Sequence, residues 1–326
     1  MIRGIAVTAS VLAVLTASLA FGGTAIPPAS FIHALLHPHA GDAAALILWQ
    51  LRMPRVAVAA TVGACLAIAG ALLQGLLRNP LVDPYLTGTS AGAAAAIALA
   101  VTAGVAAPWL PFLGFVSGLA SALLVALLAR RGPGIDVQRL ILAGVSLSAL
   151  LGAIVATVLT RMRPDDASTQ ILAWLAGSTA GRGWHDLTFA LPYAAAGIAL
   201  AFAAAPALDA LRAGEIRAAS VGVDVARAQW TILAASSLLA AAAAALAGTI
   251  GFVGLIVPHL ARHLAGSRAY VLLPSCALLG AALCSAADTV ARSLVAPAEL
   301  PLGVVLAFAG VPVFLVLYRR QEREFS

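Results

Sequence analysis

The residue types in this chain that could do chemistry are two histidines near residue 260 and the arginines. His259 and His263 are four residues apart, a spacing that puts both imidazoles on one face of a helix, where they could hold a metal ion. No third ligand and no His-Glu-x-x-His pattern accompanies them. We therefore expect no metal site, and we interpret this pair with Pro258 and Arg262 as part of an inner surface.

The basic residues also exclude some chemistry. All 19 of them are arginine, so the chain has no lysine. A Walker A loop needs its lysine on the nucleotide phosphates, and a retinal or pyridoxal Schiff base needs a lysine amine. Any work driven by ATP must therefore be done by a partner subunit. The sequence also shows no nucleophile elbow and no paired carboxylates within an apolar run, which argues against a membrane enzyme.

Composition places these residues in a membrane. The chain of 326 residues is 62% hydrophobic and 10% charged, with a mean hydropathy of +1.01. Apolar runs of about 20 residues recur from end to end, as expected for helices that cross a bilayer. The sequence therefore predicts a single all-α, polytopic membrane domain over residues 1–326. This domain would lie in the lipid bilayer and would not bind nucleic acid. The three cysteines, Cys65, Cys276 and Cys284, lie in apolar runs and are expected to pack there.

About ten membrane-spanning helices are predicted. The segment at 252–266 is short for a bilayer and contains Pro258, so whether it spans fully stays open. The apolar stretches fall at about 5–22, 55–77, 88–107, 112–131, 139–160, 186–205, 229–250, 252–266, 270–294 and 301–318.

Arginine placement favours the ten-span arrangement. With ten spans, only six arginines lie in outer segments, and the other 13 lie in inner segments or at the ends. Cytoplasmic segments of membrane proteins carry the excess of positive charge, so both termini are expected in the cytoplasm. The outer six are Arg52, Arg55, Arg161, Arg163, Arg182 and Arg292.

Two helices are expected outside the spans. Asp165, Asp166 and Ser168 are good helix starters, and they precede an apolar stretch, so a short outer helix is expected near 168–176. On the inner side, an amphipathic helix is expected near 213–222, because Glu215–Ser220 combines charged and apolar residues and stops near Gly222. The remaining outer segment, 23–54, is expected to be a loop.

The end of the second predicted span carries the strongest indication of transport. An apolar helix ends at Gln74 and continues into Asn79-Pro80-Leu81 and Asp83-Pro84, where the backbone must leave the helix. Polar, proline-broken backbone at membrane depth is tolerated where it lines a cavity or packs on protein. This favours a protein that moves a solute. A secondary transporter or channel is the alternative, but ion coupling commonly uses charges in mid-span, and here nearly all charges lie at span ends or in loops.

Motifs in the same order along the chain resemble the FecCD-type permeases, the membrane subunits of ABC importers for iron–siderophore complexes, haem and cobalamin. They are RMPR at 52–55, QGLLRNPLVDP at 74–84, GTSAG at 88–92, GEIRAASVG at 214–222, GFVGLIVPHLAR at 251–262, ADTVAR at 287–292, ELPLGVV at 299–305 and GVPVFL at 310–315. The resemblance implies a bacterial inner-membrane importer subunit with no nucleotide-binding domain and no permanently bound cofactor. Its partners would be a second copy of itself, two cytoplasmic ATPase subunits that use ATP, and a periplasmic binding protein.

The resemblance also implies residue roles. Arg52, Arg55 and Arg292 match arginines that meet glutamates of the binding protein, and Asp288 is placed to pair with Arg292 at the i,i+4 spacing. Asn79 and Leu81 match the cytoplasmic gate, whereas the segment Asp136–Arg139 matches the other gate poorly. Glu215, Arg217, Ser220 and Gly222 match the helix that couples the permease to the ATPase.

The cargo is the least specified part of the interpretation. Arg182 could attract an anionic chelate, and Trp174 could be a stacking surface or a membrane-interface anchor. His33, His37 and His39 could briefly ligate haem iron at the entrance or be solvated. The histidines and Arg182 favour haem, with a ferric siderophore or cobalamin as alternatives in the same importer class, whereas Trp174 is more typical of an anchor.

Overall fold

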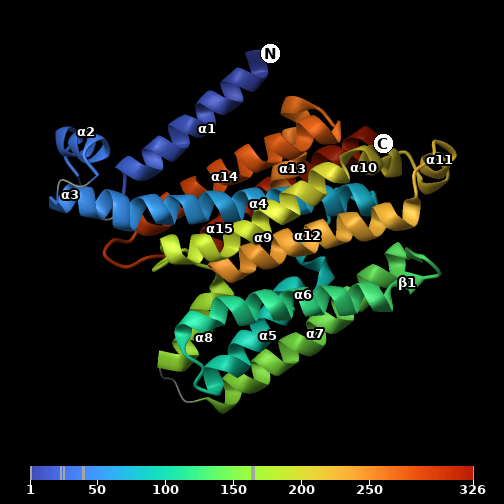
Figure 1. Cartoon of the computed structure of the whole chain (residues 1–326), viewed down its shortest axis with the longest axis horizontal. Coiled ribbons are helices and arrows are strands. Elements are labelled where there is room, and N and C mark those ends of the chain that lie inside the picture. The colour runs from blue at the N-terminus through green and yellow to red at the C-terminus, as the bar shows by residue number, and fades with distance from the viewer. Residues whose placement is uncertain (1, 23, 25, 39–40, 163–165, 326) are drawn as a thin grey trace.

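The computed structural model describes residues 2–22, 24, 26–38, 41–162 and 166–325, and over these residues the chain is almost entirely helical (Figure 1). His39 and Asp165 lie outside the described residues. The long helices are α1 (Ile2–Ala20), α4 (Met53–Leu77), α5 (Thr89–Thr102), α6 (Leu110–Leu128), α7 (Val137–Arg161), α9 (Trp184–Ala203), α12 (Val225–Ala247), α13 (Val253–Ala265), α14 (Ala269–Ser293) and α15 (Leu302–Phe325).

Each of the ten predicted spans coincides with one of these helices, so the all-α polytopic fold is confirmed. Six helical stretches in the described part of the chain are long and apolar enough to cross a membrane. They are Ala43–Leu77, Ala107–Leu128, Val137–Arg161, Trp184–Ala203, Val225–Ala247 and Ala269–Ser293. The segment at 252–266 forms α13 with 13 residues. At a rise of 1.5 Å per residue this is about 20 Å, less than the roughly 30 Å of a hydrocarbon core.

Most helices run along one direction and bring the shorter elements to the two ends of the bundle (Figure 1). One end, the α8 end, carries α2 (Pro28–Leu36), α3 (Ala43–Leu46) and α8 (Asp166–Ala176). The opposite end, the α11 end, carries α10 (Ala205–Arg212), α11 (Glu215–Ser220) and the strands β1 (Arg130–Arg131) and β2 (Gly134–Ile135). The two short outer and inner helices expected near 168–176 and 213–222 are thus present as α8 and α11, at opposite ends.

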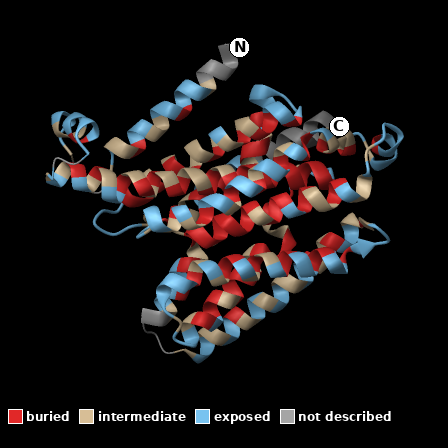
Figure 2. Ribbon diagram, viewed as in Figure 1, coloured by how far each residue is buried: buried red, intermediate tan, exposed pale blue. Residues whose placement is uncertain are grey.

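Helix α4 forms the centre of the core. Buried residues concentrate in α4 and α12, whereas α7 is mostly exposed (Figure 2). Glycines let the α4 backbone approach its neighbours closely, as small residues do in membrane helices. A Cβ atom at Gly63 would lie 2.0 Å from the carbonyl oxygen of Gly280 on α14, and one at Gly70 would lie 1.9 Å from that of Gly254 on α13.

The prediction that residues 23–54 form an outer loop was wrong, because most of this segment is helical. Asp42 caps α3 by accepting a hydrogen bond from the Ala45 amide at 2.8 Å. A π-helical turn, η1 (Ile47–Arg52), then joins α3 to α4, so one continuous helical stretch runs from Ala43 to Leu77. The other departures are helix α10, the β1–β2 hairpin and two single 3-10 turns, η2 (Pro84–Thr87) and η3 (Ala107–Trp109).

Candidate functional site

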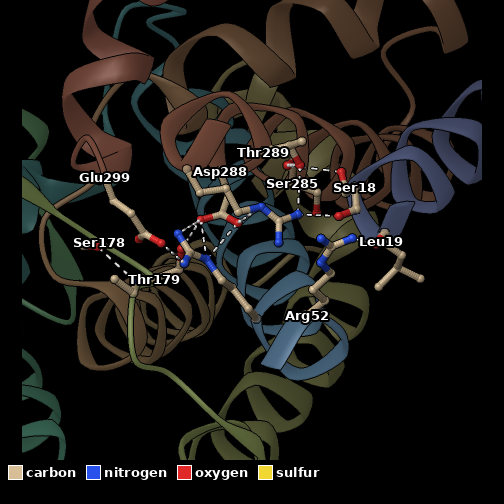
Figure 3. Close-up of polar contacts among 12 residues, drawn as sticks. Ser18, Leu19, Arg52, Ser178, Thr179, Ser285, Asp288, Thr289 and Glu299 are labelled. Carbon is tan, nitrogen blue, oxygen red and sulfur yellow. Dashed lines mark hydrogen bonds and ion pairs between the residues drawn. The ribbon is translucent and has the colours of Figure 1, made fainter. Parts of the chain in front are cut away.

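A buried charge cluster joins α4 and α14 at the α8 end, around Asp288 (Figure 3). Arg55 donates to Asp288 Oδ1 from Nη2 at 2.9 Å and from Nε at 3.0 Å, and its Nη1 donates to Glu299 Oε1 at 2.9 Å. Thr179, which follows α8, donates a hydrogen bond to the same Asp288 oxygen. Asp288 is 1% exposed. Arg55 and Asp288 therefore tie together three segments that are far apart in the sequence.

Arg292 extends this cluster toward α1. Its Nε lies 3.6 Å from Asp288 Oδ2, which confirms the predicted i,i+4 ion pair. Its Nη2 donates to the carbonyl oxygen of Ser18 and, at 3.3 Å, to the Thr289 hydroxyl. The residue is only 5% exposed, so its charge is used inside the chain.

Arg52 is also engaged internally. Its guanidinium, which lies beside Leu19 in Figure 3, donates to the carbonyl oxygens of Leu19 at 2.9 Å, of Ala20 at 2.7 Å and of Thr24. The last carbonyls of a helix lack partners within the helix, so Arg52 caps the end of α1. The structure thus brings the three predicted docking arginines to one end of the bundle, with Arg52 and Arg292 buried. Docking needs a partner protein and stays a prediction.

The predicted coupling helix projects from the α11 end (Figure 1). Glycines with positive φ flank α11, Gly214 at 112° and Gly222 at 85°, so each turn uses a backbone conformation that favours glycine. Glu215 accepts a hydrogen bond from Gln229 of α12 at 3.2 Å, and Ala218 is buried. Ile216, in contrast, is 89% exposed. Arg217 and Ser220 stay on the exposed side of the helix, where Ser220 donates back to the Arg217 carbonyl.

The predicted gate lies where α4 ends at the same end of the bundle. Asn79 accepts a hydrogen bond from the Leu81 amide at 2.9 Å, which fixes the turn, and Leu81 is 39% exposed. The sequence interpretation missed the role of Gln74, which anchors this turn to α13. Its amide donates to the Gly254 carbonyl at 3.1 Å, and its carbonyl accepts from Arg262 at 2.5 Å.

A carboxylate follows the gate turn directly. Asp83 caps η2 by accepting from the Tyr85 amide at 2.9 Å. Burial raises the pKa of the Asp83 carboxyl to about 6, and the hydrogen bond from Tyr85 opposes that shift. The segment that matched the other gate poorly begins at Asp136, whose pKa is lowered by the Arg139 amide that donates to it at the start of α7.

The predicted cargo residues separate into two groups at the α8 end. Trp174 and Arg182 both line a cavity of about 290 Å³ between α5, α8 and the segment after α8. Trp174 is 9% exposed, so it is a packed wall residue and not an interface anchor. Arg182 pairs with Asp186 at 2.9 Å.

The histidines form the second group. His33 lies on α2 and His37 directly follows it. Their rings stack with centroids 4.6 Å apart, and His33 Nδ1 lies 3.5 Å from Asp42 Oδ2. Neither histidine is among the described residues that line the cavity with Trp174. Among the described residues, no group of three histidine, cysteine or acidic side chains is arranged to hold a metal ion.

The helices and the polar clusters at their ends define a polytopic membrane permease. The FecCD transport family matches residues 10–320, and the chain belongs to that family of ABC importer permeases. It is 38% identical to the hemin transport system permease protein HmuU of Yersinia pestis, over 86% of this chain and 85% of that protein. It is 39% identical to the cobalamin import system permease protein BtuC of Halobacterium salinarum, over 86% of this chain and 75% of that protein.

A solved structure gives the same result for the fold. An ABC transporter of the metal-chelate type in an inward-facing conformation superposes with a TM-score of 0.87 at 32% identity. The match covers 97% of this chain and 98% of that one. The family recognised from the motifs is therefore confirmed, and the fold agrees over nearly the whole chain.

Proposed function

We propose that the chain is the inner-membrane permease through which a metal chelate, haem in particular, enters the cytoplasm. The observation that carries this proposal is the agreement of sequence and fold with a metal-chelate type ABC transporter over nearly the whole length. Transport would alternate access between the two sides of the membrane, driven by ATP hydrolysis in partner subunits. The chain itself would bind cargo weakly, since a tight site would slow its release.

Residues of the cavity at the α8 end support haem as the cargo, although at about 290 Å³ the cavity of one chain could hold only part of a haem. Trp174 offers an aromatic face there, and Arg182 brings a guanidinium to the same cavity. An aromatic wall and a cation suit a planar, apolar ligand that carries carboxylates. Relatives named for hemin and for cobalamin are equally similar to this chain, at 38% and 39% identity. A ferric siderophore and cobalamin therefore remain the alternative cargoes.

Orientation and partners follow from the same proposal. The α11 end and both termini would lie in the cytoplasm, which the arginine distribution supports. Two copies would form the pathway, one ATPase would meet each α11, and a periplasmic binding protein would cover the α8 end. Arg52, Arg55 and Arg292 would meet glutamates of that binding protein, with charge complementarity speeding the encounter.

Uptake into proteoliposomes tests the cargo. The permease, its cognate ATPase and its binding protein would be reconstituted and offered haem, a ferric siderophore or cobalamin, with and without ATP. We expect ATP-dependent accumulation of haem, and a loss of haem uptake in Arg182→Gln without a change in ATPase association. Accumulation of one of the other two chelates instead would replace haem as the cargo. Uptake without ATP would overturn the importer proposal itself.

The docking role has to be separated from the internal contacts of the same arginines. Arg52→Glu combined with Arg55→Glu is expected to abolish stimulation of ATP hydrolysis by the loaded binding protein. The control is the melting temperature of the permease, measured without the binding protein. Because the internal contacts of both arginines are lost as well, a lower melting temperature is expected, and lost stimulation supports docking only where ATP hydrolysis without the binding protein is unchanged. Full stimulation in the double variant would remove that role.

A further inference from the structure

A basic cavity opens at the α11 end, apart from the cavity near Trp174. Its volume is about 860 Å³, and it lies between the end of α4, the end of α10, the second half of α13 and Val313 of α15. Five of its lining side chains are basic or can be protonated: Arg78, Arg212, Arg262, His259 and His263. None of the described residues that line it carries a carboxylate.

The arginines of this cavity are only partly neutralised. Arg262 donates to the neutral side chain of Gln74. Arg212 Nη1 forms an ion pair with Asp209 Oδ1 at 3.2 Å. Both carboxylate oxygens of Asp209 also accept a hydrogen bond from the Ala269 amide at 3.0 Å. The Nη2 atom of Arg212 is buried and has no hydrogen-bond partner among the described residues. A buried, unpaired donor is costly, so an anion placed beside it would be stabilised.

Arg78 supplies a further guanidinium. It occupies the end of α4 in the left-handed conformation, with φ at 49°, a conformation uncommon for a residue other than glycine. This turn directs the side chain toward the loop between α10 and α11, where a Cβ atom at Gly214 would lie 3.8 Å from Arg78 Nη1. Within the described part of the chain, no hydrogen bond or ion pair of the Arg78 side chain is found, and the residue is exposed. Its charge is therefore available to a ligand.

The two histidines contribute hydrogen bonding on the α13 side. Their Nε2 atoms are 3.0 Å apart, so one imidazole donates a hydrogen bond to the other. A metal ion could be held by two such nitrogens, but the three guanidiniums around the same cavity oppose a cation. The charge of the cavity selects an anion instead.

The apolar part of the lining indicates which anion. Ile256, Leu260 and Val313 form one wall, and Leu260 and Val313 are 45% and 44% exposed. A soluble phosphate would use the arginines alone, whereas a phospholipid would also cover the apolar wall with its acyl chains. Basic pockets between helices at the cytoplasmic surface suit anionic headgroups. We propose that this cavity binds the phosphate-bearing headgroup of an anionic phospholipid, with Arg78 and Arg212 on the phosphate oxygens.

A bound lipid would add to the polar contacts that Gln74 and Arg212 already make among these elements. It would join the end of α4 to α10 and α13, next to Asn79 and Pro80, which line the same cavity. Because α10 leads directly into α11, headgroup occupancy would hold the gate turn and the root of the coupling helix in one arrangement. The inference does not depend on which chelate is carried.

The test measures stabilisation of the purified full-length chain in neutral detergent–phosphatidylcholine micelles. Short-chain phosphatidylglycerol would be titrated in, with short-chain phosphatidylcholine and inorganic phosphate as parallel arms, and the melting temperature recorded. We expect phosphatidylglycerol alone to raise it in a saturable way. Arg78→Gln should raise the apparent Kd about tenfold, the effect of losing one charge-assisted contact. Arg212→Gln should act in the same direction.

Arg139→Gln is the matched control. Arg139 is an exposed arginine at the same end of the bundle, on the first turn of α7, and it does not line the cavity. Its substitution should leave the apparent Kd within about twofold, as expected for a surface charge. Equal weakening by Arg78→Gln and Arg139→Gln would mean diffuse attraction and would overturn the proposal. An equal, Arg78-dependent response to inorganic phosphate would also overturn it, in favour of a soluble anion.

Discussion

Asp288 is the residue on which the packing of helices at the α8 end depends. It is almost fully buried, and it faces the guanidiniums of both Arg55 and Arg292. The spacing of the sequence predicted only the local pair with Arg292. The stronger contact, with Arg55, joins residues 233 positions apart, and no periodicity in a chain reveals a contact of that kind. The same holds for Arg52, whose burial against the end of α1 sequence reasoning did not foresee.

Removal of the Asp288 carboxylate should destabilise the chain strongly. Asp288→Ala leaves Arg55 without its bidentate partner and Arg292 without a nearby counter-charge. Breaking a buried ion pair from one side costs about 3–5 kcal/mol, because an uncompensated charge remains buried. We expect a large fall in melting temperature and in folded yield, measured on the purified chain in detergent.

Glu299 provides the control for that experiment. It contacts the same Arg55 at 2.9 Å, but its side chain is 38% exposed. Exposed pairs contribute about 1 kcal/mol or less, so Glu299→Gln should change the melting temperature little. A loss in Glu299→Gln as large as in Asp288→Ala would show that burial of Asp288 is not what makes its pair important.

At the scale of elements, the apolar runs predicted each long helix, because a bilayer requires about 20 apolar residues per span. Helix-starting residues also predicted α8, and the amphipathic pattern that stops near Gly222 predicted α11. The sequence did not predict α2, α3 or the π-helical turn at Ile47–Arg52, since 23–54 combines prolines, glycines and histidines typical of loops. The shortness of α13 was visible in the sequence, but its close packing on α4 was not.

Contact between α4 and α13 depends on glycine at position 70. A Cβ atom there would lie 1.9 Å from the Gly254 carbonyl oxygen, so the two helices would have to separate. We expect Gly70→Ala to lower folded yield and melting temperature. The loss in free energy of unfolding should be about 1–3 kcal/mol if the helices can shift and larger if they cannot. Gly152→Ala on α7 is the matched control, because a Cβ atom there meets nothing within 4 Å. An equal effect of both substitutions would show that helix propensity and not close packing decides the outcome.

The exposed face of α11 should serve a partner and not the fold. Ile216 is 89% exposed, whereas Ala218 on the same helix is buried. Ile216→Asp is therefore expected to change the free energy of unfolding of the permease by no more than about 0.5 kcal/mol, and its melting temperature little. The same substitution should weaken co-purification of the cognate ATPase and reduce ATP-dependent uptake at least tenfold, which is about 1.4 kcal/mol of contact energy. Normal ATPase association would mean that α11 does not provide the coupling contact.

At the scale of the whole molecule, one helix is left with little to pack against. Only 11% of the apolar window of α7 is buried, compared with 78% for α4 and α12 (Figure 2). Its few buried residues, Leu140, Gly144 and Val155, face the rest of the chain. Lipid can cover such a face, but so can a second copy of the same chain, which the family resemblance predicts.

Spin labels can distinguish these two coverings of α7. Leu150 is 61% exposed on α7, and Leu127 is 50% exposed on α6. The native cysteines Cys65, Cys276 and Cys284 are buried, so a label added to the folded protein should react with an introduced cysteine. If two copies meet along α7, the label on Leu150→Cys should show strong dipolar coupling to its counterpart, at a distance of roughly two helix diameters or about 20 Å. The label on Leu127→Cys should show a longer distance or none. A short distance for Leu127→Cys alone would place the contact on α6, and no coupling at either position would leave both faces to lipid.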